Sequence, residues 1–254
     1  MFPMNDSLKN KTIIVTGAGG NIGRAYCDAL IRHGANVVLA DLADLSGVAA
    51  DYRSTGGSAL AIRLDVADPA SIEAMARAAY ERFGAIDGIV NNAGFFKGCT
   101  FGSFMDIPVD EWDRCYQINV RGVWLCCRAV VPYMKRTGGG KIVNISSNTP
   151  YKGVPNFLHY VSSKAAIIGL TRALAREVGE FNIQVNTLCP DLIPDPDIVA
   201  KQGTAADEKT IAQRCLKRTQ TPGDMVGSLL YLLDSGSDFV TGQSLLVNGG
   251  AFFQ

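Results

Sequence analysis

Short apolar runs alternate with longer amphipathic stretches along the whole chain. The apolar runs are rich in β-branched residues and continuous in character, which is typical of strands buried on both faces. Strands are predicted at Thr12–Thr16, Asn36–Ala40, Ala59–Leu64, Gly88–Asn91, Lys141–Ile145, Gln184–Leu188 and Ser244–Val247. Helices are predicted between them at about Ile22–His33, Ser46–Ser54, Ser71–Phe83, Asp110–Lys135, Asn156–Glu180 and Gly223–Leu232.

The strict alternation of strand and helix predicts the fold class. It implies a parallel sheet with helices on both faces. We therefore expect an α/β protein with a doubly wound, Rossmann-like sheet of about seven strands. A chain of 254 residues, 47% of them hydrophobic, can bury one sizeable core. Residues 1–254 are thus expected to form a single domain without a separate substrate domain.

One segment interrupts the alternation. Residues 192–221 follow the sixth predicted strand and are first rich in Pro and Asp, then weakly helical. Ligands of an open parallel sheet bind outside the carboxyl ends of its strands. An irregular insertion at that edge is therefore expected to cover a substrate.

Composition narrows the classes of partner. The 24 basic and 24 acidic residues cancel, so electrostatics favours neither a nucleic acid nor a membrane surface. No apolar run approaches the ~18 residues needed to span a bilayer, and residues 1–6 lack the regions of a secretory signal. The seven Cys include no C-x-x-C pair, which indicates reduced, mostly buried thiols in a cytoplasmic protein.

The most informative candidate chemistry is the sequence Tyr160-Val-Ser-Ser-Lys164 within a predicted helix. Residues four apart share one face of a helix. A phenol is a poor base at neutral pH, but an ammonium group beside it should lower its pKa. Such a pair can donate and accept a proton, as alcohol–carbonyl interconversion requires. The pairing can also arise by chance, so its interpretation depends on the other motifs.

A glycine-rich turn follows the first predicted strand, in the sequence Thr16-Gly-Ala-Gly-Gly-Asn-Ile-Gly23. Backbone N–H groups at such a turn can approach a pyrophosphate, and the next helix adds a favourable partial charge. The spacing differs from G-x-G-x-x-G, with Asn21 where Gly is expected. We expect Asn21 to accept a positive φ there. A tight connection without a ligand explains the turn about as well.

Asp41 ends the second predicted strand, 18 residues after Gly23. An acid at this point binds the ribose 2′-hydroxyl of NAD and repels the 2′-phosphate of NADP. No basic residue follows directly, so NAD is favoured over NADP. The alternative is that Asp41 only caps the next loop.

Together these motifs resemble the short-chain dehydrogenase/reductase family, in its compact single-domain branch, and the resemblance runs from Thr16 to Gly250. Its landmarks are Thr16-Gly17 with Gly23, Asp65-Val66, Asn91-Asn92-Ala93-Gly94, Asn119, Ser147, Tyr160 with Lys164, and the tail Thr241-Gly242-Gln243 with Val247-Asn248-Gly249-Gly250. Several independent motifs in one order are more specific than any single one.

The resemblance implies catalytic roles. Tyr160 would be the acid/base, and Lys164 would bind the nicotinamide ribose and lower the tyrosine pKa. Ser147 would bind the substrate oxygen, and Asn119 would anchor a water that links Lys164 to solvent. Ser146 could replace Ser147, although neighbours on an extended segment point in opposite directions. Asn119 could instead only cap backbone groups in its helix.

The resemblance also implies a cofactor site. Its residues are Gly17, Asn21, Ile22, Gly23, Asp41, Asp65, Val66, Asn91, Ala93, Gly94, Tyr160, Lys164, Pro190 and Ile193. Asp65 and Val66 would flank the adenine, and Asn91 would line the cleft, although Asn91 and Asn92 could simply shape a turn. His159 adjoins Tyr160 but points to another side of the helix, which favours a bystander or substrate-side role.

Two positions depart from the family pattern. Asp191 follows Pro190 where Gly is usual, and we expect it to adopt the glycine turn at modest strain. Asp195 stands where a threonine normally contacts the nicotinamide carboxamide. An anion there would stabilise NAD⁺ more than NADH and favour alcohol oxidation. The alternative is an exposed acidic loop.

The sequence thus predicts an NAD-dependent oxidoreductase that interconverts a secondary alcohol and its ketone. An apolar or ring-bearing substrate is favoured by side chains expected near the cleft, which are Phe95, Phe96, Pro150, Tyr151, Val154, Phe157 and Leu158. The alternatives are an NADPH-dependent carbonyl reductase and a non-enzymatic nucleotide-sensing scaffold on the same fold. The family resemblance implies a homotetramer, with contacts through the two longest helices and Phe252-Phe253, and no metal.

Overall fold

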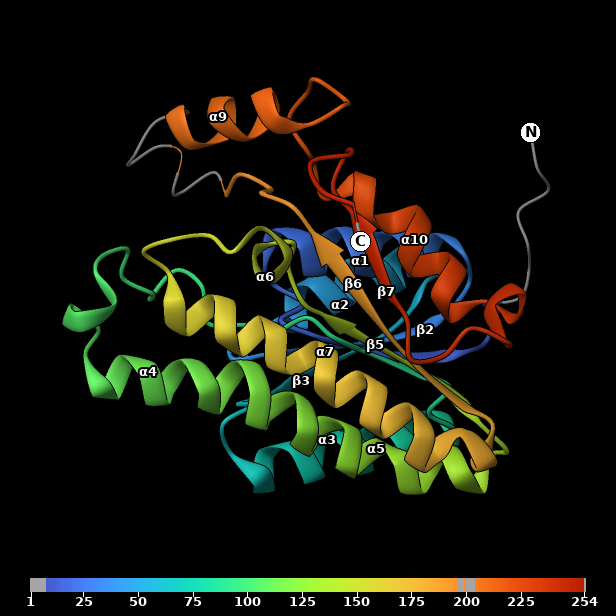
Figure 1. Ribbon diagram of the computed structural model, residues 1–254. Helices are drawn as coiled ribbons and strands as arrows, with labels where there is room; N and C mark the ends of the chain where they lie inside the picture. The colour runs from blue at the N-terminus through green and yellow to red at the C-terminus, as the bar shows by residue number, and fades with distance from the viewer. Residues whose placement is uncertain (1–7, 196–198, 200–203, 254) are drawn as a thin grey trace.

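The computed structural model describes residues 8–195, 199 and 204–253 (Figure 1). The terminal residues 1–6, on which the expectation about secretion rests, lie outside this range, as does part of segment 192–221. Within the described residues, no helix is both long and apolar enough to cross a membrane.

One parallel sheet of seven strands forms the centre, in the order β3-β2-β1-β4-β5-β6-β7. The strands are β1 Thr12–Thr16, β2 Asn36–Asp41, β3 Ser58–Arg63, β4 Gly88–Asn91, β5 Gly140–Ile145, β6 Ile183–Pro190 and β7 Ser244–Val247. The predicted doubly wound α/β class is confirmed, and all seven predicted strands form.

The strand order reverses beside β1, which pairs with β2 on one side and β4 on the other. In doubly wound sheets the ligand crevice lies at this switch point, outside the carboxyl ends of the strands. The residues that directly follow β1, β4, β5 and β6 therefore meet at one edge. The candidate motifs Gly17, Asn92 and Ser147 come from these positions.

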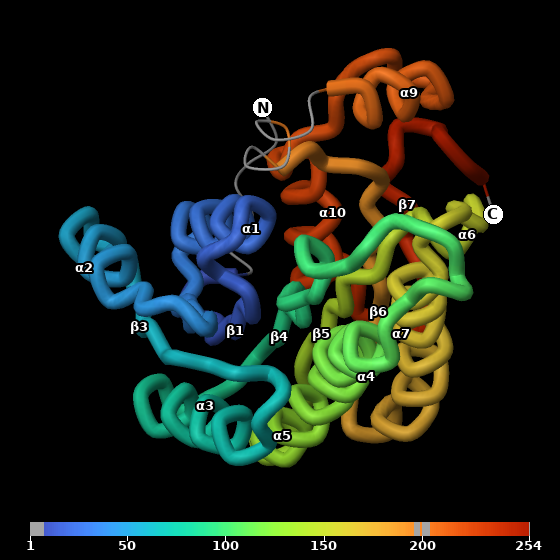
Figure 2. Tube along the Cα trace, turned by 90° about the vertical axis from the view of Figure 1, so that its left-hand side faces the viewer, coloured from blue at the N-terminus to red at the C-terminus, as the bar shows by residue number. Residues whose placement is uncertain are grey.

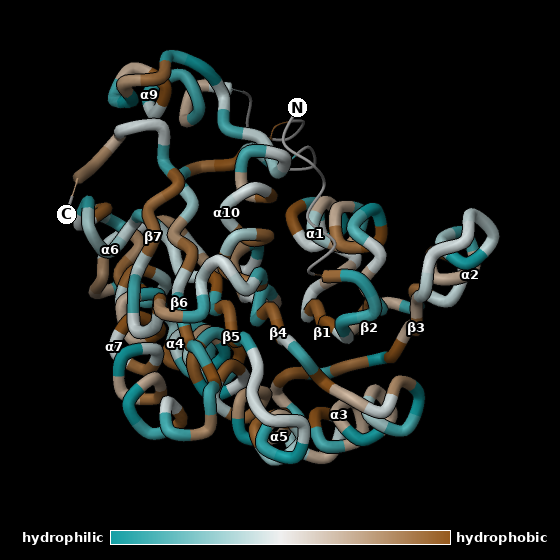
Figure 3. Tube along the Cα trace, turned by 90° about the vertical axis from the view of Figure 1, so that its right-hand side faces the viewer, coloured by the Kyte–Doolittle hydropathy of each residue, from teal (hydrophilic) through white to brown (hydrophobic). Residues whose placement is uncertain are grey.

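Helices cover both faces of the sheet (Figure 2). The longer ones are α1 Asn21–Arg32, α2 Ser46–Ser54, α3 Pro69–Phe83, α4 Val109–Tyr116, α5 Val123–Arg136, α7 Leu158–Val178, α9 Ala205–Gln213 and α10 Gly223–Leu233. Two buried clusters result, one with α3, α5 and α7, the other with α1, α2 and α10. Neighbouring strand residues serve opposite clusters, as Ile13 and Ile14 do, and parts of the tube beside the β1 and β5 labels are brown, the hydrophobic colour, in Figure 3.

The helix predicted at Asp110–Lys135 forms, but its hydrogen-bonding pattern changes within it, which the sequence did not indicate. A π-helical turn at Gln117–Gly122 separates α4 from α5. Insertions of this kind occur often at functional sites, and this one carries Asn119. The helix predicted at Asn156–Glu180 begins at Leu158 instead. Asn156 has a φ of 61°, which a residue of a right-handed helix does not adopt.

Candidate active site

Tyr160 and Lys164 lie on the first turns of α7 and are both buried. The Lys164 Nζ lies 5.7 Å from the centroid of the Tyr160 ring. It donates a hydrogen bond of 2.9 Å to the Ile145 carbonyl at the end of β5. The shared face predicted from their spacing is therefore confirmed, and the contact with Ile145 holds the ammonium group against the sheet edge.

Ser147 and Ser146 have different partners. The Ser147 side chain forms a hydrogen bond with Tyr160 and accepts another from the Thr149 backbone N–H at 3.1 Å. The Ser146 hydroxyl donates to the Lys164 carbonyl oxygen at 2.7 Å. Ser146 is thus occupied in anchoring α7, whereas Ser147 faces the phenol.

Asn119 joins the π-helical turn to the loop after β4. Its Oδ1 accepts a hydrogen bond from the Phe95 N–H at 2.6 Å, and its Nδ2 donates to the Phe95 carbonyl at 3.2 Å. The same Nδ2 donates to the Ser163 hydroxyl at 3.0 Å on α7. Asn119 therefore caps a neighbouring loop rather than its own helix. A Cβ added at Gly94 would lie 3.4 Å from Asn119 Oδ1 and 3.5 Å from Lys164 Nζ, so Gly94 lies close to both.

Burial, and not Lys164, has the largest effect on the pKa of Tyr160. Burial raises the pKa of Tyr160 above the ordinary value of a phenol, and the hydrogen bond from Ser147 opposes this rise. Burial also lowers the pKa of Lys164 to about 8. In both cases the low-polarity surroundings disfavour the charged form. The prediction that the ammonium group leaves the tyrosine pKa lowered is thus wrong for the protein alone.

Aromatic rings pack around the phenol. Phe157 stacks on Tyr160 with centroids 4.6 Å apart, and Phe96 meets it edge-on at 5.4 Å. Phe101 stacks in turn on Phe157 at 4.0 Å. Phe157 is itself only 1% exposed, so it supports the wall from behind. Tyr151 packs against Phe252 instead.

The glycine-rich turn leaves no room for side chains. Gly17 has a φ of 65°, and a Cβ there would lie 2.9 Å from the Ala93 Cα. A Cβ at Gly23 would lie 2.1 Å from the Gly17 carbonyl oxygen. The expected positive φ at Asn21 was wrong, because Asn21 is the first residue of α1 and no cap requires that conformation. Ile22, the second residue of α1, is partly buried against the core.

Asp41 lies at the end of β2 and faces the glycine turn. Its Oδ2 accepts from the Gly19 N–H at 2.9 Å, and its Oδ1 accepts from the Ala43 N–H at 3.0 Å. The carboxylate therefore caps its own loop and borders the nucleotide turn as well. The loop-cap interpretation is therefore confirmed, and contact with a cofactor ribose stays a prediction.

The loop after β4 is tied to the glycine turn by side chains. The Thr16 hydroxyl accepts from the N–H groups of Asn92 and Ala93 at 3.0 Å each. The Asn92 amide donates to the carbonyls of Thr16 and Gly17 at 3.0 and 3.1 Å. Asn92 thus shapes the turn, as one interpretation proposed.

Asn91 is buried beneath that loop. Its Nδ2 donates to Asn144 Oδ1 at 2.8 Å, while its own Oδ1 is buried without a hydrogen-bond partner among the residues that the structure describes. It lines a narrow gap, too small for a water molecule, together with Thr16, Val66, Ala93, Ile118, Gly122, Val123 and Cys126. The Asp65 side chain accepts from the Ala67 N–H at 2.8 Å and so caps the turn before α3. A close-fitting glycine turn and an orphaned acceptor fit a dinucleotide at this edge.

The two departures from the family pattern are both in ion pairs. Asp191 follows Pro190 at the end of β6, and its carboxylate is 6% exposed. It contacts Lys152 Nζ at 2.7 Å and Arg214 Nε at 3.0 Å. Asp191 does not have a positive φ, so the expectation that it copies a glycine turn was wrong. Asp195 pairs with Lys97 at 3.0 Å and is 21% exposed.

Arg214, which lies within segment 192–221, ties that segment to Asp191. Its side chain is 1% exposed, and Nη2 donates to the Leu192 carbonyl at 2.7 Å. Ile193 follows and packs against the core on the α10 side. Sequence reasoning missed Arg214 and Lys152, since only proximity in space joins them to Asp191.

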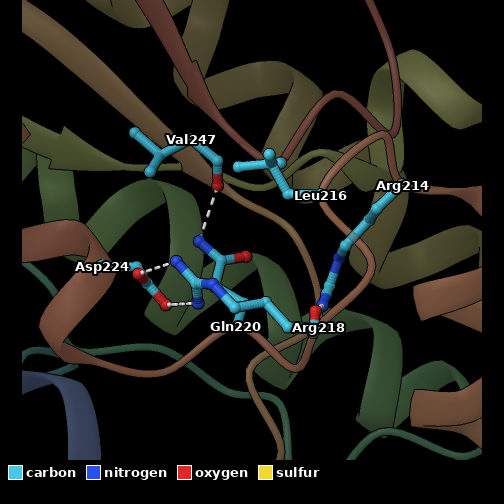
Figure 4. Close-up of a pocket in the computed structure, with 7 residues that line it drawn as sticks. Arg214, Leu216, Arg218, Gln220, Asp224 and Val247 are labelled. Atoms are coloured by element: carbon cyan, nitrogen blue, oxygen red, sulfur yellow. Dashed lines mark hydrogen bonds and ion pairs between the residues drawn. The ribbon is translucent and has the colours of Figure 1, made fainter.

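A cavity of about 210 Å³ lies beyond Arg214 (Figure 4). Its lining is Arg214, Leu216, Arg218, Gln220, Asp224, Val247 and Gly249, none of which is a predicted site residue. Arg218 forms two hydrogen bonds with Asp224, and Gln220 donates to the Val247 carbonyl at 2.7 Å. These polar groups are occupied with one another, so the cavity offers little to a ligand.

Comparison with known proteins agrees with this geometry. A family model described as Enoyl-(Acyl carrier protein) reductase matches residues 17–251. Trans-4-hydroxycyclohexanecarboxylate dehydrogenase of Sinomonas cyclohexanicum is 36% identical over 258 residues, which cover 98% of this chain and 96% of that protein. An NAD⁺-bound xylitol dehydrogenase structure has a TM-score of 0.90 at 30% identity, over 96% of this chain and 99% of that one.

A short-chain type dehydrogenase/reductase from Mycobacterium ulcerans has a TM-score of 0.91 at 27% identity, over 96% of this chain and 90% of that one. The chain is an oxidoreductase. It belongs to the short-chain dehydrogenase/reductase family.

Proposed function

We propose that the protein oxidises a secondary alcohol to its ketone with NAD⁺, and that Tyr160, Lys164, Ser147 and Asn119 are the catalytic residues. The observation that carries this proposal is the buried contact between Tyr160 and Ser147, with the Lys164 ammonium group beside the same ring. A proton acceptor, a hydroxyl for the substrate oxygen and a cation thus share one site at the sheet edge.

The residues divide the reaction between them. The Tyr160 phenolate oxygen accepts the proton of the substrate hydroxyl, while the Ser147 hydroxyl donates to the oxygen that becomes the carbonyl. A bound NAD⁺ would supply the acceptor for the hydride that leaves the carbinol carbon. Burial lowers the pKa of Lys164 to about 8, and in its protonated form its ammonium group favours the phenolate. Asn119 holds the Phe95 backbone and so fixes the loop that borders the site.

NAD is the favoured cofactor because Asp41 places a carboxylate beside the glycine turn. A carboxylate there binds a ribose hydroxyl and repels a 2′-phosphate. Two of the similar proteins are named for alcohols, one of them ring-bearing. The rings of Phe96 and Phe157 beside Tyr160 favour an apolar or ring-bearing secondary alcohol.

A screen of cyclic and open-chain secondary alcohols tests the function, with NAD⁺ and NADP⁺ compared through the absorbance of the reduced cofactor. The variant Tyr160→Phe should lower kcat by about 10²–10⁴-fold and leave NAD⁺ binding nearly intact. Tyr151→Phe is the matched control, because Tyr151 packs against Phe252 instead. Turnover of Tyr160→Phe within a few-fold of the native enzyme would contradict the assignment of the base.

We also propose that the enzyme is cytoplasmic and that copies associate through α5 and α7. Trp124 on α5 and Leu158 on α7 are 48% and 46% exposed, which is typical of apolar surface covered by a partner. Light scattering should give the mass of a tetramer. A monomer at micromolar concentration would contradict the association.

A further inference from the structure

Three side chains with metal-binding atoms converge beside the proposed active site. Cys99 comes from the loop after β4, Glu111 from α4 and His159 from the start of α7. One thiol sulfur, one carboxylate oxygen and one ring nitrogen all lie within 4.8 Å of one another. None of the three is needed for the proposed proton transfer.

The His159 ring is the least satisfied member of this cluster. It is 0% exposed, and its Nε2 lies 2.8 Å from Glu111 Oε1. Glu111 is thus the polar partner of Nε2, whereas the buried Nδ1 has no hydrogen-bond partner among the described residues. In a tetrahedral metal site the ligand atoms point at a common centre instead of at one another. Tetrahedral ligand atoms at about 2.0–2.1 Å from a metal lie about 3.3 Å apart, so this pair would separate slightly when a cation binds.

Outer contacts hold the other two ligands in place. Glu111 accepts from the Thr100 N–H at 2.6 Å through Oε1 and from the Thr100 hydroxyl at 2.7 Å through Oε2. Cys99 forms a hydrogen bond with the Cys115 thiol. Partners of this kind orient ligands in metal sites. The cluster is therefore a built arrangement with fixed side chains.

We propose that Cys99, Glu111 and His159 bind one thiophilic divalent cation of the Zn²⁺ class per chain. Thiolate, imidazole and carboxylate together suit Zn²⁺ and Co²⁺ better than Mg²⁺ or Ca²⁺. On binding, the Cys99 thiol releases its proton to solvent and a sulfur–metal bond forms. The neutral imidazole binds through Nε2 and the carboxylate through Oε1, and the fourth position is left for water.

The cation would connect three elements that surround the catalytic tyrosine. Cys99 follows Phe96, whose ring meets Tyr160 at 5.4 Å, and His159 directly precedes Tyr160. Occupancy therefore fixes the loop after β4 against α4 and α7. The effect is on the walls of the substrate site, and the proton path itself is unchanged.

Titration of the metal-free protein with Co²⁺ tests the proposal, because a cobalt–thiolate bond gives a charge-transfer absorption band. One equivalent should saturate the band, and Zn²⁺ should abolish it by displacement. Cys99→Ser should remove the band, and His159→Asn should raise the Kd measured by calorimetry by more than about tenfold. Cys99→Ser exchanges a single atom in a partly buried side chain, so it remains informative if the buried His159 variant does not fold.

Cys215→Ser is the matched control, because Cys215 is an exposed thiol on another segment. It should leave both the band and the Kd unchanged. The absence of a saturable band would overturn the proposal. So would a band that survives in Cys99→Ser, or one that disappears in Cys215→Ser, since either result would place the metal at another thiol.

Discussion

Close backbone contacts fix the chain at the carboxyl end of β1, whereas buried ion pairs fix it at the carboxyl end of β6. Gly17 and Gly23 pack so closely that neither admits a Cβ, and Asn92 bonds to backbone carbonyls there. At the other end, Asp191 lies between Lys152 and Arg214 with almost no exposure to solvent. The first region keeps the glycines Gly17 and Gly23 of the family pattern, and the second departs from that pattern at Asp191.

The difference concerns how each region tolerates change. A turn fixed by close backbone contacts fails when atoms are added. A buried ion pair fails when one partner is removed, because the remaining charges are left in a medium that solvates them poorly. The contribution of Asp191 to stability therefore depends on its two partners, Lys152 and Arg214.

The largest expected effect comes from Asp191→Gly, which restores the residue usual in the family. It leaves Lys152 and Arg214 largely buried without their carboxylate, so the free energy of unfolding should fall by about 3–5 kcal/mol. Denaturant unfolding measures this change. Glu73→Gln is the control, because its pair with Arg128 is exposed and should contribute less than about 1 kcal/mol. Equal stability of Asp191→Gly and the native protein would remove the distinction between the two regions.

Gly23→Ala probes the opposite region by adding atoms. The new Cβ would lie 2.1 Å from the Gly17 carbonyl, so the turn must shift, at a cost of about 1–3 kcal/mol in unfolding free energy. The dissociation constant of NAD⁺ should rise as well. The matched control is Gly47→Ala on α2, where a Cβ meets nothing within 4 Å. That variant should be neutral or slightly stabilising.

The same comparison explains what the sequence could predict. The strands, the glycine turn and the pairing of Tyr160 with Lys164 follow from periodicity and short spacings, and they were predicted. The Asp191 network joins residues 39 and 23 positions away, and no local pattern indicates such a pairing. The sign of the Tyr160 pKa shift was also missed, because burial depends on how far the whole chain encloses a side chain.

The π-helical turn that carries Asn119 was missed for a related reason. The sequence over 110–135 is helical in pattern throughout, and an extra residue in one turn leaves the hydrophobic period almost unchanged. What fixes the turn is the contact of Asn119 with Phe95, a residue of a different element.

A smaller effect is expected from Asp41→Asn at the nucleotide turn. The amide oxygen can still accept from the Gly19 N–H, but the charge that repels a 2′-phosphate is lost. The ratio of kcat/KM for NAD⁺ to that for NADP⁺ should fall by about tenfold. Asp44→Asn is the control, since Asp44 is exposed and caps Ser46 in the same loop. If the two variants behave alike, Asp41 acts only as a loop cap.

The smallest expected effect is at Asp195, where charge again replaces the usual family residue. An isolated anion near the nicotinamide would favour NAD⁺ over NADH, but Lys97 lies 3.0 Å away and offsets that charge. Asp195→Thr should therefore change the ratio of the two cofactor dissociation constants by less than about threefold. Lys97→Met should raise the preference for NAD⁺ by more than Asp195→Thr lowers it. Calorimetry on both variants measures these dissociation constants. A change of the ratio by more than about threefold in Asp195→Thr would mean that Lys97 does not offset the charge of Asp195 at the nicotinamide.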